Sequence, residues 1–105
     1  MAWAAGDPVP NPTAGEVLVQ VVFTHGRPVF VVVAVSSKVG LDTILRLIAA
    51  DAVTVKHSII LPVTGSLWVS PRLGPIQVGP NERLQVISRN AVTGAEVQAS
   101  LFYDT

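Results

Sequence analysis

Residues 29–35, VFVVVAV, form an unbroken apolar run made mostly of β-branched side chains. A strand with one solvated face carries a polar residue at every second position, and this run does not. The run is therefore typical of a β-strand that is covered on both faces. We expect one face to pack against the core of the protein and the other to be covered by something else.

Short apolar segments bounded by turn residues continue along the rest of the chain. Residues 16–23 alternate along a strand and are followed by a Gly/Pro turn at residues 25–28, so residues 16–36 are predicted to form a hairpin. Further strands are predicted at residues 53–62, 66–69, 76–78, 82–88 and 96–103. About eight short strands at this spacing predict an all-β fold, a compact β-sandwich or jelly roll.

Residues 41–50, LDTILRLIAA, fit two structures. As a helix, the segment has one apolar stripe, made of Leu41, Ile44, Leu45 and Ile48. Asp42 and Arg46 then form an i, i+4 pair. As a strand, alternate residues face opposite sides. Local propensity favours the helix, whereas the β-rich surroundings favour the strand, and the strand is the prediction made here.

The first fifteen residues differ in composition from the rest of the chain. They contain Pro8, Pro10 and Pro12 and a single charged residue, Asp7, which is typical of an extended, polyproline-like arm without internal hydrogen bonds. The alternatives are a disordered tail and an arm that becomes ordered on a neighbouring molecule, with Trp3 as its anchor. The predicted organisation is an arm over residues 1–15 and a single β-sandwich domain over residues 16–105.

Half of the 105 residues are hydrophobic, and only 13% are charged. A single domain of this size buries about two-thirds of its unfolded surface, so its core is too small to hide all of these side chains. A subunit interface is the usual solution, and we expect a homo-oligomer. The candidate interface residues are aromatic residues and the prolines of the arm: Trp3, Pro8, Pro10, Pro12, Phe30, Trp68, Phe102 and Tyr103.

The residues that catalysis and metal binding require are sparse. There is no cysteine, and the two histidines, His25 and His57, are 32 positions apart, so we expect neither a zinc site nor any other cofactor. Ser58 follows His57 within a predicted strand, where neighbouring side chains point to opposite faces, so a Ser–His nucleophile is not expected. The prediction is that the chain is not an enzyme.

Two classes of partner are also unexpected. The formal net charge is zero, whereas a nucleic-acid-binding protein carries a basic face, so no nucleic-acid partner is expected. The longest apolar stretches, residues 17–26 and 28–37, are shorter than the roughly 20 residues of a transmembrane helix, so no membrane partner is expected. Glycan binding stays open as an alternative, because Trp3, Trp68 and Tyr103 are rings on which a sugar could stack.

A Pro-rich arm, a Val-rich β-sandwich, the turn segment at residues 78–84 (VGPNERL) and the last strand at residues 96–103 (EVQASLFY) resemble the small capsid decoration or cement proteins of tailed phages. The resemblance lies in architecture over residues 16–105 and rests on no diagnostic motif, so it assigns no functional residue. It implies a trimer that stabilises a viral shell, with the major capsid protein or another shell subunit as partner. It also implies synthesis in the host cytoplasm and a final location on the capsid surface of the virion. A lectin-like or receptor-binding β-sandwich is the alternative function.

Overall fold

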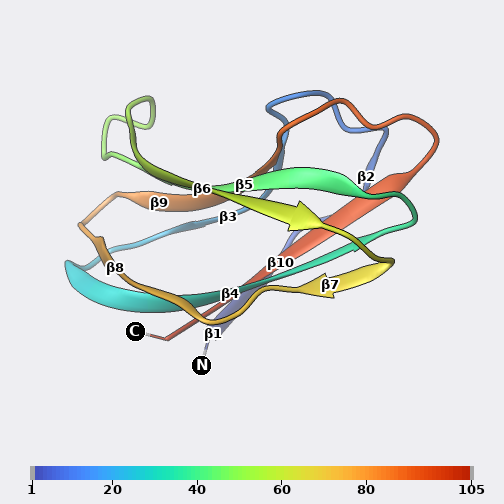
Figure 1. The fold of residues 1–105 in the computed structure, drawn as a ribbon. Coiled ribbons are helices and arrows are strands. Elements are labelled where there is room, and N and C mark those ends of the chain that lie inside the picture. The colour runs from blue at the N-terminus through green and yellow to red at the C-terminus, as the bar shows by residue number, and fades with distance from the viewer. Residues whose placement is uncertain (1, 105) are drawn as a thin grey trace.

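The computed structural model describes residues 2–104, which form strands and loops without a helix (Figure 1). None of these residues belongs to a helix with the length and apolar character needed to cross a bilayer. The strands are β1 (Ala2–Ala5), β2 (Val9–Pro10), β3 (Val17–Val22), β4 (Arg27–Ser37), β5 (Leu41–Ile48), β6 (Val55–Val63), β7 (Leu67–Val69), β8 (Leu73–Val78), β9 (Arg83–Ser88) and β10 (Glu96–Asp104).

The strands form two antiparallel sheets that lie face to face (Figure 1). One sheet has the order β1-β10-β4-β7, with β2 also paired to β10 and β8 also paired to β4. The other sheet has the order β3-β9-β5-β6. The chain changes sheet on entering β3, β4, β5, β7, β9 and β10, so the two sheets are wound together as a jelly roll. The predicted all-β sandwich is confirmed.

The core lies between the sheets and is filled by alternate residues of the central strands. On β4 the inward residues are Val29, Val31, Val33 and Val35, each of which is almost completely buried. They face the inward residues of the other sheet, which include Leu45, Leu47, Leu84 and Val86. Each buried aliphatic side chain of this size stabilises the fold by roughly 1.5–3 kcal/mol. The alternating pattern places the remaining residues of β4 on the outside of the six-stranded sheet.

Residues 41–48 are a strand, as the β-rich surroundings predicted. Leu41, Thr43, Leu45 and Leu47 point into the core, and the hydroxyl of buried Thr43 donates a hydrogen bond to the carbonyl of Leu61 at 3.0 Å. A helix would have placed Ile44 on the same apolar stripe as Leu41, whereas in the strand Ile44 points outward and Leu47 points into the core. Burial between two sheets therefore outweighs the local helix propensity of this segment.

The predicted hairpin over residues 16–36 is wrong. Both of its strands exist, but β3 pairs with β9 in the four-stranded sheet, whereas β4 pairs with β10, β7 and β8 in the six-stranded sheet. The turn between them carries the chain across the sandwich instead of folding it back within one sheet. Both arrangements bury the same apolar residues, so the alternation in the sequence does not distinguish them.

Residues 2–5 and 9–10 run along β10, in blue beside red in Figure 1. The hydrogen bonds of this segment run to the sandwich: β1 and β2 both pair with β10, and Gly6 between them donates its N–H to the carbonyl of Ala99 at 2.9 Å. The arm thereby covers the edge of β10, whose backbone groups would otherwise be unpaired. Its predicted contact with a neighbouring molecule stays a prediction.

Candidate functional site

The outer side of the six-stranded sheet carries aromatic and aliphatic side chains on three neighbouring strands. On β4, Phe30 and Val32 point outward, because Val29, Val31 and Val33 point into the core. Val32 lies opposite Phe102 of β10, and Phe102 lies opposite Trp3 of β1. Side chains opposite one another on antiparallel strands share a face, so Trp3, Phe102 and Val32 form one row across the sheet.

The rings of this row are in contact. Trp3 and Phe102 stack with ring centroids 6.1 Å apart and planes 17° apart. The guanidinium of Arg72 lies 4.0 Å from the centroid of the Phe30 ring and 3.4 Å from the carboxylate of Asp104. Trp3 is nevertheless 63% exposed, so stacking covers little of its surface. Large aromatic residues and arginine are the residue types that contribute most to protein interfaces.

Two exposed aliphatic residues extend this surface on β7. Val69 lies opposite Ala34 and Leu67 lies opposite Ser36, both on the outward side of β4. Leu67 is 71% exposed and Val69 is 57% exposed. We call the surface made by these outward side chains the aromatic face, and it consists of Trp3, Phe30, Val32, Leu67, Val69 and Phe102.

Two of the predicted aromatic candidates lie on the opposite side of the same sheet. Trp68 pairs with Val35, and Tyr103 pairs with Val31, so both side chains point inward. Tyr103 packs edge-on against the ring of Phe23, with centroids 5.6 Å apart. Both rings are half-buried against the core. The structure thus brings Trp3, Phe30 and Phe102 together and separates Trp68 and Tyr103 from them.

The predicted prolines of the arm lie elsewhere. Pro8 and Pro10 are exposed and line an open groove of about 570 Å³ with polar residues that include Lys38, Glu96 and Gln98. Pro12 is buried, and its carbonyl accepts a hydrogen bond from the N–H of Val92 at 2.9 Å. The three prolines therefore fix the path of the arm at the end of the sandwich and do not contribute to the aromatic face.

A second, apolar groove of about 390 Å³ opens between β6 and β8. It is lined by core residues such as Leu45 and Leu47 and by His57, Ile59 and Ile76. His57 and Ile59 point inward, since they pair with Leu47 and Leu45, yet they are exposed because the two sheets separate at this edge. Ser58 points to the other face, which agrees with the strand geometry expected for a His–Ser neighbour pair.

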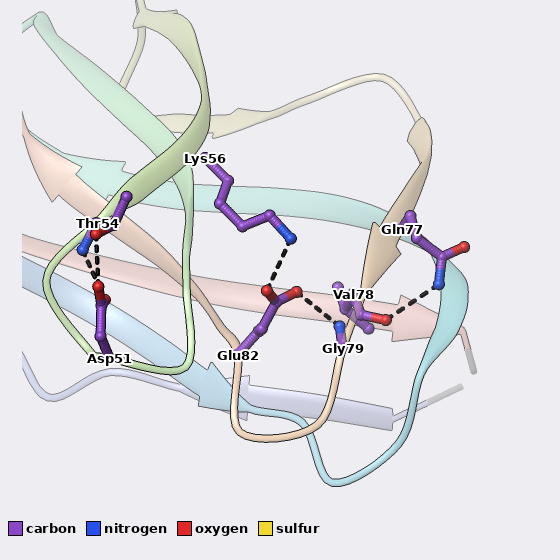
Figure 2. Close-up of polar contacts among 7 residues, drawn as sticks. All are labelled: Asp51, Thr54, Lys56, Gln77, Val78, Gly79 and Glu82. Atoms are coloured by element: carbon purple, nitrogen blue, oxygen red, sulfur yellow. Dashed lines mark hydrogen bonds and ion pairs between the residues drawn. The ribbon is translucent and has the colours of Figure 1, made fainter.

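Two acidic residues, Asp51 and Glu82, bind loop backbone and neighbouring side chains (Figure 2). The Glu82 carboxylate accepts hydrogen bonds from Lys56 Nζ at 2.8 Å and from the N–H of Gly79 at 2.7 Å, and the lysine is the main reason why the pKa of Glu82 is lowered. Asp51 accepts bonds from the hydroxyl and the N–H of Thr54 and from the N–H of Val53, which lower its pKa to about 2.

Both networks hold loops in place. Within residues 2–104 there is no group of three or more His, Asp or Glu side chains arranged to hold a metal ion. The aromatic face consists of apolar side chains, three of which (Trp3, Leu67 and Val69) are more than half exposed.

Part of the aromatic face was missed in the sequence. Val32, Leu67 and Val69 were not candidates, although alternation along residues 29–35 places Val32 on the same side as Phe30. No such signal exists for Leu67 and Val69, because their position depends on the pairing of β7 with β4.

Comparison of the chain with protein-family models, with curated proteins and with solved structures finds no match.

Proposed function

We propose that this protein is a structural assembly subunit, a jelly-roll capsid decoration or cement protein that acts as a homo-oligomer, in the form of a trimer. The observation that carries the proposal is the aromatic face, a continuous apolar surface with Trp3, Leu67 and Val69 more than half exposed. Isolated exposed apolar residues are normal on a soluble protein, but a contiguous patch that contains aromatic residues marks an interaction surface.

The residues of β4 support self-association in particular. The run at residues 29–35 has the composition of a strand covered on both faces, but within one chain only its inward residues are buried. Phe30 and Val32 are half-buried and stay open to solvent together with Trp3. A second copy of the chain would complete the cover that the composition of β4 requires. Around a threefold axis, each copy would place its aromatic face against its neighbours.

The proposed action is purely physical. A trimer that contacts the assembled shell, with the major capsid protein or another shell subunit as partner, would bind the shell more tightly than its separate parts. Binding would then stabilise the shell by mass action. Three contacts on one oligomer and many oligomers on one lattice would add avidity to weak single contacts. The glycan-binding alternative has less support, since two of its three candidate rings, Trp68 and Tyr103, point into the sandwich and only Trp3 is largely exposed.

The experiment is a mass measurement by light scattering, made on the wild type and on a Leu67→Ser, Val69→Ser double variant. The wild type is expected at about three times 11.1 kDa and the double variant at a lower mass, because both residues lie on the aromatic face. Val53→Ser, in the exposed loop before β6, is the matched control and should keep the wild-type mass. A monomeric wild type at all concentrations would contradict the proposal.

The shell contact is tested separately by sedimentation. Empty shells of the encoding virus, stripped of this protein, are mixed with the wild type and pelleted. Saturable co-sedimentation is expected, and its absence would contradict the decoration function even if the protein is a trimer.

A further inference from the structure

The outer side of the four-stranded sheet has a different chemistry from the aromatic face. Arg46 lies opposite Gln85, and Arg83 lies opposite Ile48, while their neighbours Leu45, Leu47 and Leu84 fill the core. Both arginines therefore point outward. They are diagonal neighbours on adjacent strands, roughly 7–8 Å apart between Cα atoms in such a geometry.

Neither arginine has a carboxylate partner within the described part of the chain. The ion pairs there are Lys56–Glu82, Arg72–Asp104 and Arg89–Asp42. Arg27 and Lys38 are also outside these pairs, but they are exposed and can be hydrated. Arg46 and Arg83 are half-buried, so they lose part of their hydration without gaining a counter-charge.

The hydrogen bonds of the two guanidinium groups are also incomplete. Arg83 Nε is buried and has no acceptor among residues 2–104. Arg46 Nε donates to Gln85 Oε1 at 2.9 Å, and Gln85 Nε2 donates to Gln20 Oε1 at 2.9 Å. This ladder across three strands fixes the position of Arg46 on the face. A buried donor without an acceptor is uncommon in folded proteins, and here it leaves the Arg83 guanidinium without compensation from the chain itself.

Arg46 itself has polar cross-strand neighbours, Gln85 and Ser58, but aliphatic residues flank this row. One cross-strand row beside them contains Val17, Ile87, Ile44 and Ile60, in that order across the sheet. On the other side, Val22 and Val55 each expose about half of their surface, at 48% and 47%. An aliphatic surround excludes water from a charge pair and strengthens it.

We propose that this face binds an acidic segment of a partner protein, with a carboxylate held between Arg46 and Arg83 and aliphatic neighbours packed on the flanking rows. Arginine presents planar paired donors that match a carboxylate, and such bonds are stronger than those between neutral groups. A nucleic acid fits less well, because the face offers two unpaired cations and no aromatic ring, and the chain has zero net charge.

The inference rests on the proposed function in one respect only: it takes the partner that contacts this face to be a shell subunit. The aromatic face lies on the other sheet of the sandwich. The two proposals can therefore fail separately. A monomer that binds the acidic peptide would contradict only the proposed oligomer, and a trimer that does not bind it would contradict only this inference.

The test is an NMR titration at low salt. The protein carries ¹⁵N-labelled arginine side chains, and a blocked Val-Glu-Val-Glu-Val peptide is added as the probe. Saturable shifts are expected for the Nε–H signals of Arg46 and Arg83. Loss of a charge-assisted pair weakens binding by about tenfold or more. We expect this weakening for the Arg46→Gln variant, for the Arg83→Gln variant and for a Val-Gln-Val-Gln-Val peptide added to the wild type. Arg27→Gln removes the same charge from an exposed site of the other sheet and should change nothing.

Four results would overturn the inference. They are the absence of saturable shifts in the wild type, equal binding of the glutamine peptide, equal shifts on addition of inorganic phosphate alone, and an equal loss in Arg27→Gln. The wild-type titration needs no variant, so a variant that fails to fold does not rescue the inference.

Discussion

Replacement of Trp3 by alanine separates the stability of one chain from the stability of the proposed oligomer. A tryptophan side chain offers roughly 250 Å². Because Trp3 is 63% exposed in the single chain, about 160 Å² of this is open to a partner. At about 25 cal/mol per Å², complete burial of that area in an interface contributes up to about 4 kcal/mol per chain.

The expected result of Trp3→Ala is therefore a large loss of self-association, up to about a thousandfold in the dissociation constant. The area already covered within the chain, about 90 Å², corresponds to at most about 2 kcal/mol of unfolding free energy. Sedimentation velocity over a range of concentrations measures the first quantity, and urea unfolding at a concentration where both proteins are monomeric measures the second.

Val53→Ala is the matched control for this experiment. Val53 is 79% exposed but lies in the loop before β6, away from the aromatic face, so self-association should not change. If the wild type forms an oligomer and Trp3→Ala dissociates no more readily, Trp3 lies outside the contact and the assignment of the aromatic face is wrong.

Three further predictions concern the fold. Gly6→Ala should release the arm, because a Cβ at this position would lie 2.0 Å from the carbonyl oxygen of Leu18, and hydrogen exchange of the β1 amides should then become fast; unchanged protection would contradict this. Leu47→Ala should lower the unfolding free energy by about 2–5 kcal/mol in urea, since Leu47 is fully buried, and a loss below 1 kcal/mol would contradict it. The pKa of Asp51 is lowered from 3.8 to about 2, so the ionised carboxylate stabilises the fold above pH 4, and this stabilisation is lost as the pH falls towards 2. Asp51→Asn should therefore make Tm fall less steeply over that pH range, and an unchanged slope would contradict this prediction.

The fold class could be read from the sequence because it depends on local patterns. The unbroken run at residues 29–35 and the regular spacing of turn residues require only the period of a β-strand. The same argument correctly favoured a strand at residues 41–50, where the surrounding strands decided against helix propensity. The predicted pairing of β3 with β4 was wrong, because a sequence pattern states which residues are buried and does not state which sheet buries them.

The candidate surfaces depend on long-range register and were only partly predictable. Trp3, Phe30 and Phe102 were candidates as aromatic residues, but their grouping required the pairing of β1 with β10 and of β10 with β4. Arg46 and Arg83 gave no sequence signal, since single basic residues in a neutral chain are typical of a solvated surface. Their significance follows from the absence of carboxylates beside them in the described structure.

The central claim is that the aromatic face is the contact between copies of the chain, and fluorine NMR of protein containing 5-fluorotryptophan tests it directly. The chain has two tryptophans, and a Trp3→Phe sample assigns their signals. We predict that the Trp3 signal loses its sensitivity to exchange of H₂O for D₂O as the protein concentration rises, while the half-buried Trp68 changes little. A Trp3 signal that stays fully solvent-sensitive in the oligomer would contradict the account.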